Sequence, residues 1–222
     1  MKKQISSLLA VAVLGFCGST MAQKAGSFSA SIGATLISPS VSSGNLSAPS
    51  LPNTQIDVNS NTQITGAVNY MMTDNIAIHV PLGFGYKFDI SGAGAISGVG
   101  KLVETKALPI TAIAQYRFLD ANATFRPYLG AGLSYVRFYK EKGTGTLSAL
   151  TNPGGPATGA KFESKLAPTV QIGGIYNINE KWYVDASYLK TLLKTQAKLT
   201  TGQTIDVKLD PNSYSVQVGY KF

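Results

Sequence analysis

The last nine residues of the chain, 214 to 222, place the strongest constraint on its fold. Apolar or aromatic side chains occupy every second position, and small or polar side chains occupy the positions between them. The apolar set is Tyr214, Val216, Val218, Tyr220 and Phe222. Such alternation is typical of a β-strand whose two faces meet different surroundings. Lipid outside and a polar lumen inside would satisfy it, and an ordinary half-buried strand is the alternative.

The first 22 residues predict export from the cytoplasm. Two lysines precede a short apolar run, and the small residue Ala22 follows it, which is the pattern of a secretory signal peptide cleaved after Ala22. The run is too short for a transmembrane helix. It contains Cys17, the single cysteine of the chain. The mature protein, residues 23–222, is therefore expected to be one domain without a disulfide.

Composition limits how the mature chain can enter a membrane. Hydrophobic residues make up 44% of the sequence and charged residues 14%, but no long uncharged apolar run follows the signal peptide. Membrane insertion would therefore require a β-barrel, because a barrel satisfies every backbone polar group between its strands. The formal net charge of +8 falls to +6 when Lys2 and Lys3 leave with the signal peptide, and this basic surplus suits contact with anionic lipid or lipopolysaccharide phosphate, although it also suits solubility.

Eight segments show the same two-residue alternation. They are 28–36, 64–72, 76–88, 108–118, 125–135, 166–176, 182–188 and 214–222. The connections alternate between long and short, with long polar loops expected at 38–60, 89–106 and 140–163, and the boundaries between 188 and 214 are the least defined. This rhythm predicts an all-β fold, an up-and-down, eight-stranded antiparallel transmembrane β-barrel with short periplasmic turns and long extracellular loops. A soluble lipocalin-like barrel would have the opposite polarity, apolar inside.

Aromatic residues on the outward face are expected to form two belts at headgroup level. The periplasmic belt would hold Phe28, Tyr70, Tyr116, Phe118, Phe125, Tyr176, Trp182, Tyr220 and Phe222. The extracellular belt would hold Phe84, Tyr86, Phe88, Tyr135, Tyr188 and Tyr214. This assignment treats 76–88 as one uninterrupted strand.

Five inward positions predict a charged cluster near the periplasmic end of the lumen. They are Arg117, Arg126, Asp185, Lys221 and, somewhat above them, His79. Buried charges require partners, so an ion pair between Asp185 and one arginine is expected. Eight strands enclose an interior that side chains nearly fill, which excludes a wide pore. The cluster would either close the lower lumen to apolar solutes or serve as a structural core without a role in transport.

Two prolines suggest a weak place in the barrel wall. Pro81 and Pro109 lie on strands joined by the second long loop, and proline lacks the backbone N–H that a sheet ladder needs. A bulged or open ladder there would let an apolar solute leave sideways into the membrane. The alternative is that each proline only shapes a strand end.

Enzymatic and nucleic-acid functions find little support in the residues. His79 is the only histidine, there is no G-x-S-x-G nucleophile elbow, and a zinc site would lack ligands. The glycines between 92 and 100 miss the spacing of the phosphate-binding fingerprints. Basic residues do not interleave with aromatics as on a nucleic-acid surface. We therefore expect no catalytic residue, metal or cofactor.

Several segments together resemble the outer membrane protein W (OmpW) family. They are 33–39, 108–118, the RPYLGAG run within 126–135, the strand of Trp182, and 220–222. The resemblance spans nearly the whole mature chain. The first strand lacks the Trp and Arg associated with the family, and residues 81–84 read Pro-Leu-Gly-Phe where Pro-Phe-x-His is expected. These departures put the gating residues, not the fold, in question.

The resemblance implies an outer-membrane barrel for passive uptake of small hydrophobic molecules, with lateral release into the membrane. It also implies assembly by the barrel-assembly machinery, with Tyr220 and Phe222 as the signal at the end of the chain. The main alternative is a structural barrel whose extracellular loops bind lipopolysaccharide, host surfaces or bacteriocins. A membrane-embedded lipid enzyme is a weaker third hypothesis.

Overall fold

The computed structural model describes residues 23–222, so the predicted signal peptide and its cleavage after Ala22 lie outside the described residues. Within this range the chain is almost entirely β-sheet. Its elements are β1 (Phe28–Ser38), β2 (Ser42–Ser43), β3 (Thr54–Val58), β4 (Asn61–Met71), β5 (Ile76–Leu82), β6 (Tyr86–Gly94), β7 (Lys101–Arg117), β8 (Phe125–Gly143), α1 (Gly145–Thr151), β9 (Ala160–Phe162), β10 (Lys165–Asn177), β11 (Trp182–Thr191), β12 (Lys194–Leu199), β13 (Thr204–Lys208) and β14 (Asn212–Lys221).

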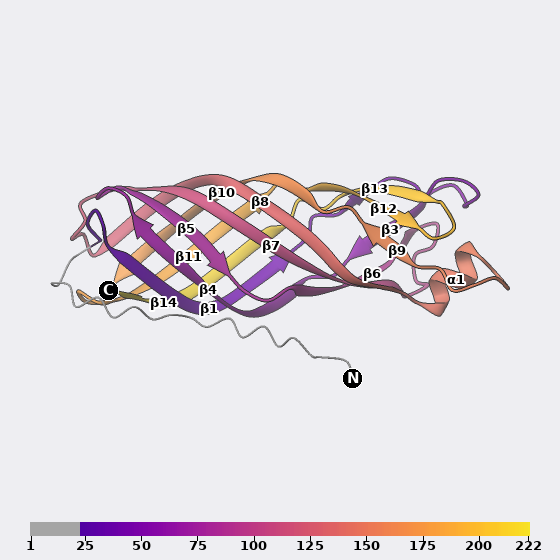
Figure 1. Cartoon of the computed structure of the whole chain (residues 1–222), viewed down its shortest axis with the longest axis horizontal. Helices are drawn as coiled ribbons and strands as arrows, with labels where there is room; N and C mark the ends of the chain where they lie inside the picture. The colour runs from indigo at the N-terminus through magenta and orange to yellow at the C-terminus, as the bar shows by residue number, and fades with distance from the viewer. Residues whose placement is uncertain (1–22) are drawn as a thin grey trace, which may run out of the picture.

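Ten strands form one closed antiparallel sheet (Figure 1). Their order is β3-β6-β7-β5-β4-β1-β14-β11-β10-β8, and pairing of β7 with β8 completes the ring. β5 and β6 act as one stave interrupted at residues 83–85, and β3 is an added strand on β6, so the barrel has eight staves. The predicted eight-stranded barrel is therefore confirmed.

The C-terminal strand closes the barrel against the first strand. β14 pairs with β1 from Ser29 opposite Lys221 to Ser38 opposite Asn212. The short turns 72–75, 118–124 and 178–181 lie at the same end of the barrel as Phe222. We call this the lower end, and the opposite end, where the long connections lie, the upper end.

The barrel wall is apolar outside and largely polar inside over its lower part. Ile32, Ile64 and Val216 are more than 60% exposed on the outer face, whereas Thr65, Gln115 and Thr169 are buried on the inner face. This is the polarity of a membrane barrel, since lipid and not water then meets the outer face. No helix within residues 23–222 is long and apolar enough to span a membrane.

The lower aromatic belt forms as predicted. Phe28 packs against Tyr70 with ring centroids 4.6 Å apart, and Tyr116 packs against Phe118 at 5.0 Å. Both pairs lie on the outer face near the lower end, where amphipathic rings stabilise a barrel at the level of the headgroups.

The upper belt differs from the prediction at two positions. Tyr86 and Phe88 are 4% and 7% exposed and point into the barrel, whereas Phe84 remains outside. His79 lies opposite Ile113 but Tyr86 lies opposite Ala107, so six residues, 80 to 85, face five residues, 108 to 112. The extra residue behaves as a bulge and reverses the alternation, because a shift of one residue exchanges the two faces of a strand.

Three segments predicted as loops are largely folded, which corrects the prediction. Residues 89–94 and 101–106 extend β6 and β7, 140–143 extend β8, and β2 and β3 lie within 38–60. A second, four-stranded sheet in the order β2-β13-β12-β9 stands above the barrel with α1 beside it (Figure 1). Buried apolar side chains such as Ile90, Leu102 and Leu199 hold this upper region together, which the glycine- and serine-rich composition did not reveal.

Candidate functional site: a lumen in three layers

Arg117 organises the bottom of the lumen. It is the last residue of β7 and is 1% exposed. Its Nη1 donates to Gln23 Oε1 (2.9 Å), and its Nη2 donates to Asn69 Oδ1 (3.1 Å) and Gln115 Oε1 (2.9 Å). Amide oxygens from three parts of the chain therefore satisfy this buried guanidinium, as a buried charge requires.

Arg126, the second residue of β8, fixes the lower turns. It is fully buried, and its Nη2 donates to the carbonyl oxygens of Asp74 (2.6 Å) and Leu119 (3.3 Å). Its Nη1 also reaches Gln23 Oε1 at 3.3 Å. One planar donor thus joins two turns and the segment before β1, a bridging geometry that suits arginine better than lysine.

The expected ion pair between Asp185 and an arginine is not formed, so that prediction was wrong. The Tyr128 hydroxyl donates to the Asp185 carboxylate, with oxygen distances of 3.0 and 3.1 Å. The five ion pairs within residues 23–222 do not include Asp185 or either lower arginine. Neutral amide and backbone carbonyl oxygens accept the hydrogen bonds of both arginines, and the carboxylate of Asp185 accepts instead from the Tyr128 hydroxyl across the lumen.

His79 and Lys221 lie in the same layer, as their inward positions implied. His79 is 8% exposed, and its Nδ1 lies 2.7 Å from Asn69 Oδ1, the same oxygen that accepts from Arg117. Lys221 is 6% exposed near the end of β14. The structure brings all five predicted residues to the lower lumen. Their role in excluding solutes stays a prediction.

Two tyrosines fill the space between these polar groups because glycines stand opposite them. Tyr128 on β8 faces Gly173 on β10, and Tyr183 on β11 faces Gly219 on β14. A Cβ at either glycine would collide with the ring of the tyrosine. The inward glycines therefore leave room for both rings, which fill space in the lower lumen.

We call this layer the lower polar cluster. It consists of Gln23, Asn69, His79, Gln115, Arg117, Arg126, Tyr128, Tyr183, Asp185 and Lys221. Sequence reasoning placed Asn69, Gln115, Tyr128 and Tyr183 on inward faces but assigned them no role. Gln23 precedes the first strand, so no alternation could have placed its side chain between two arginines.

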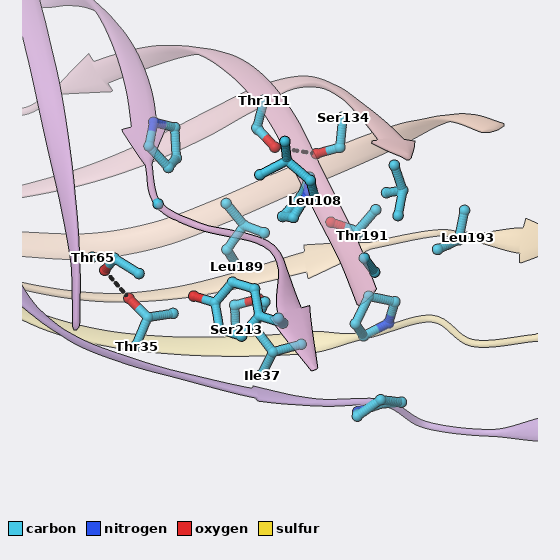
Figure 2. Close-up of a pocket in the computed structure, with 18 of the residues that line it drawn as sticks. Thr35, Ile37, Thr65, Leu108, Thr111, Ser134, Leu189, Thr191, Leu193 and Ser213 are labelled. Atoms are coloured by element: carbon cyan, nitrogen blue, oxygen red, sulfur yellow. Dashed lines mark hydrogen bonds between the residues drawn. The ribbon is translucent and has the colours of Figure 1, made fainter. Parts of the chain in front are cut away.

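A ring of hydroxyl groups lies above the lower polar cluster. The oxygens of Thr35 and Thr65 are 2.6 Å apart, and those of Thr111 and Ser134 are 2.7 Å apart (Figure 2). Ser134 also lies 2.8 Å from Thr169. These groups satisfy one another along the wall, so the ring offers a solute a neutral surface with few free donors.

A cavity of about 130 Å³ occupies the lumen above Arg117, and its wall combines apolar side chains with the hydroxyl ring, His79 and Asp185. Ile37, Leu189 and Leu193 border it from three strands or strand ends (Figure 2), and Phe88 and Val136 line it from β6 and β8. A second cavity of about 220 Å³ lies above, between α1, β9, β12 and the segment around β3. The two cavities share Ile56, Ile90 and Phe162, so an apolar surface continues from the upper end into the barrel.

The bulge between β5 and β6 interrupts their hydrogen-bond ladder with β7 beside this cavity. Residues 80–85 and 108–112 are not paired with each other, and we call this stretch the ladder gap. Pro81 and Pro109 both lie in it, and both line the upper cavity together with Gly83 and Phe84. On the side away from β7, residues 80–82 of the gap pair with β4. Beyond them, Gln63 Nε2 on β4 donates to Phe84 O at 2.7 Å, and β6 pairs with β3 from Ile90 upward.

Tyr220 and Phe222 lie on the outer face at the lower end. The ring centroid of Tyr220 is 5.0 Å from that of Trp182 and 5.3 Å from that of Phe222, and the Phe222 N–H donates to Phe28 O at 3.0 Å. Their role as an assembly signal stays a prediction. Within the described chain, no three His, Cys, Asp or Glu side chains lie close enough to hold a metal ion.

The comparisons with known proteins agree with this barrel. The model of the OmpW family matches residues 24–222. The chain belongs to the OmpW family. Outer membrane protein W of Vibrio cholerae serotype O1 is 35% identical over 231 residues, which cover 100% of both chains. The OmpW resemblance expected from the sequence is thus confirmed, and the chain is an outer-membrane protein with its lower end in the periplasm.

A solved OmpW-like structure supports the fold in detail. The crystal structure of the outer membrane protein OprG from Pseudomonas aeruginosa superposes with a TM-score of 0.80 at 25% identity, covering 90% of this chain and 97% of that chain. The dibenzothiophene metabolism operon protein PahQ of Pseudomonas aeruginosa is 25% identical over 182 residues, which cover 80% of this chain and 79% of PahQ.

Proposed function

We propose that this OmpW-family barrel passes small hydrophobic molecules from the cell exterior into the hydrocarbon region of the outer membrane. The solute enters the upper cavities, is stopped by the lower polar cluster, and leaves sideways through the ladder gap. The observation that carries this proposal is the position of the gap: it opens the wall beside the apolar cavity, between Pro81 and Pro109.

The contrast between the layers supports the direction of exit. Apolar side chains such as Phe88 and Val136 line the cavity together with hydroxyls, His79 and Asp185, whereas Arg117 and Arg126 do not line it and are surrounded by hydrogen-bond partners. An apolar solute that moved downward would have to break those hydrogen bonds without replacing them, which is costly in a buried site. Movement through the gap leads to lipid, where the solute loses no favourable contacts.

The wall around the gap supports the same route. Phe84 is 84% exposed on the outside, and Leu82 beside it is 50% exposed. A solute leaving the cavity would therefore meet apolar side chains and then acyl chains. The name of the relative PahQ also fits a hydrophobic cargo, because dibenzothiophene is a flat, apolar ring compound.

Deletion of Phe84 tests this route directly. The deletion leaves five residues opposite 108–112, so β5, β6 and β7 can keep one register from His79 to Tyr86 while Tyr86 keeps its inward face. Phe84→Ala is the matched control, because it removes the same ring but keeps the extra residue. We expect the deletion variant to take up 1-N-phenylnaphthylamine at least about tenfold more slowly in whole cells, and Phe84→Ala to retain most of the rate.

Heat-modifiable migration would show that each variant is folded before uptake is compared. Uptake by the deletion variant at the wild-type rate would contradict lateral exit, and so would an equal loss in both variants, since that would assign the effect to the ring. Pro81→Ala adds a second test because it restores a backbone N–H in the gap. Unchanged uptake in Pro81→Ala would argue against a role for this proline.

A further inference from the structure

The outer face of β6, β7 and β8 changes character just above the upper aromatic residues. Tyr135 on β8 lies opposite Ile110, and both face outward. Two residues further up, Arg137 lies opposite Leu108, and the next pair on the same face is Lys106 opposite Tyr139. Two residues of strand rise by about 7 Å, so these cations lie where lipid headgroups follow the hydrocarbon.

A third cation stands beside them. Lys87 on β6 lies directly opposite Lys106 on β7. Residues directly opposite have Cβ atoms about 5 Å apart, and like charges in this position are unfavourable. Their neighbours in sequence, Tyr86 and Ala107, are buried in the barrel, so both lysines project from the outer face. We call Lys87, Lys106 and Arg137 the cation row.

Acidic residues do not neutralise the whole row. Glu104 accepts from Lys87 (2.9 Å) and from Lys101 (3.4 Å), and Asp89 pairs with Lys101 at 3.2 Å. The hydrogen bond from Lys87 holds the pKa of the Glu104 carboxyl below its ordinary value, so Glu104 is ionised at neutral pH. Among residues 23–222, no ion pair includes Lys106 or Arg137.

The order of charged residues up the outer face indicates which part of the membrane the cation row faces. Asp89 lies opposite Glu104, further from the membrane than Lys87 and Lys106. From the hydrocarbon upward, the face therefore reads aromatic, then cationic, and then mixed, because Lys101 pairs with Asp89 and Glu104 and Lys142 lies opposite Glu104. The cations without an ion pair, Lys106 and Arg137, thus lie directly above the aromatic residues, where a layer of phosphates above the acyl chains would attract them.

The opposite side of the barrel lacks such a row. Ser38 on β1 and Asn212 on β14 are paired at the corresponding level, and Lys190 on β11 is already bonded to Asp210 O (2.7 Å) and Asn212 Oδ1 (2.9 Å). Three adjacent strands therefore carry Lys87, Lys106 and Arg137, whereas the opposite side carries Lys190, whose donors are already bonded to neutral oxygens. This one-sidedness fits a single bound lipid better than a uniform electrostatic belt.

We infer that Lys87, Lys106 and Arg137 form a binding site for the phosphate of lipid A in the outer leaflet, with the acyl chains lying along the outer face of β7 and β8. The anion relieves the repulsion between Lys87 and Lys106. Arg137 and Lys106 supply charge-assisted hydrogen bonds to its oxygens. This inference does not depend on passage of a solute through the lumen.

Binding of lipid A to the purified, full-length barrel in detergent tests the site. Native mass spectrometry would compare bisphosphorylated lipid A with the same lipid after removal of its phosphates. We expect the double variant Lys106→Gln/Arg137→Gln to bind bisphosphorylated lipid A roughly 30-fold more weakly, since each cation near a membrane surface contributes about 1 kcal/mol. Lys87 is left intact because it also binds Glu104.

The matched control removes two exposed lysines elsewhere, Lys181 in a lower turn and Lys198 on β12. Lys181→Gln/Lys198→Gln should keep the wild-type affinity. The inference is overturned if both double variants lose affinity equally, which would indicate only net charge. It is also overturned if the wild-type barrel binds dephosphorylated lipid A as tightly as bisphosphorylated lipid A.

Discussion

The upper and lower halves of the lumen are built on the same eight staves but by different means. Below, Arg117 and Arg126 are surrounded by amide and carbonyl oxygens, and tyrosine rings fill the remaining space. Above, Phe88, Val136 and Leu193 line a cavity that shares wall residues with a second cavity nearer the upper end. Tyrosine rings and hydrogen-bonded charges fill the lower half, whereas incomplete filling by side chains leaves a cavity in the upper half.

A charge placed in the upper half of the lumen should cause the largest loss of stability and of solute uptake. Val136→Asp would bury a carboxylate in the apolar cavity without a partner, and we expect it to lower the free energy of unfolding by about 4 kcal/mol or more and to abolish uptake of an apolar solute. Ser134→Asp, two residues lower, would meet the hydroxyls of Thr111 and Thr169 and should cost much less. Urea unfolding in vesicles, followed by fluorescence of Trp182, the only tryptophan, would measure both. Equal losses in the free energy of unfolding for Val136→Asp and Ser134→Asp would contradict the distinction between an apolar upper half and a polar lower half.

Removal of Arg117, the cation at the centre of the lower polar cluster, should cause the second-largest loss of stability. Arg117→Ala leaves the oxygens of Gln23, Asn69 and Gln115 without this donor, and we expect a loss of about 3 kcal/mol in the free energy of unfolding. Water should fill the vacated space, so single barrels in planar bilayers should conduct small ions more than wild type. Arg117→Lys should give a smaller loss, because lysine keeps the charge although it cannot span three acceptors in one plane. Unchanged conductance would show that the tyrosines close the lumen without the arginine.

Packing in the lower half should tolerate little extra volume. Gly219→Ala places a Cβ against the ring of Tyr183, and we expect a loss of about 2 kcal/mol in the free energy of unfolding. Gly145→Ala in α1 is the control, since no atom lies within 4 Å of the position that its Cβ would occupy, and it should be neutral. Thermal unfolding followed by circular dichroism would compare them. A neutral Gly219→Ala would mean that the ring moves freely.

Substitution in the hydroxyl ring, which lies between the two halves, should cause the smallest loss in the free energy of unfolding. Ser134→Ala removes contacts to both Thr111 and Thr169, and we expect a loss of about 1 kcal/mol, because the remaining hydroxyls can rotate toward other partners. Urea unfolding in vesicles would detect this difference. A loss as large as that of Arg117→Ala would place the ring within the lower polar cluster.

Alternation along each strand was sufficient to predict the barrel and most of its faces. Each lower stave has one face in lipid and one in the lumen, so the period of two is strict and the inward position of Arg117, Arg126 and Asp185 followed from it. The partners of those residues did not follow. Alternation says which face a side chain occupies but not which groups lie across the lumen, and Asp185 therefore bonds to Tyr128 and not to an arginine.

The upper half was harder to predict for two physical reasons. An unpaired extra residue in the ladder gap reverses the faces of Tyr86 and Phe88, and a bulge is visible only when the partner strand is known. Above the membrane, inward apolar residues such as Ile90 and Leu102 alternate with small or charged ones. The glycines and serines of these upper segments led to a prediction of loops, although the segments continue as strands that the apolar core holds together.

The cation row has a consequence for the protein before it reaches the membrane. The upper parts of β6 and β8 place apolar side chains on both faces over short stretches, for example Leu133, Tyr135 and Val136, and such stretches are prone to pair with one another in an unfolded chain. Arg137 and Lys87 interrupt these stretches with charge, as gatekeeper residues do beside aggregation-prone strands. We therefore expect the charges of Arg137 and Lys87 to disfavour pairing between such stretches in the unfolded polypeptide as well as to mark the outer face of the finished barrel.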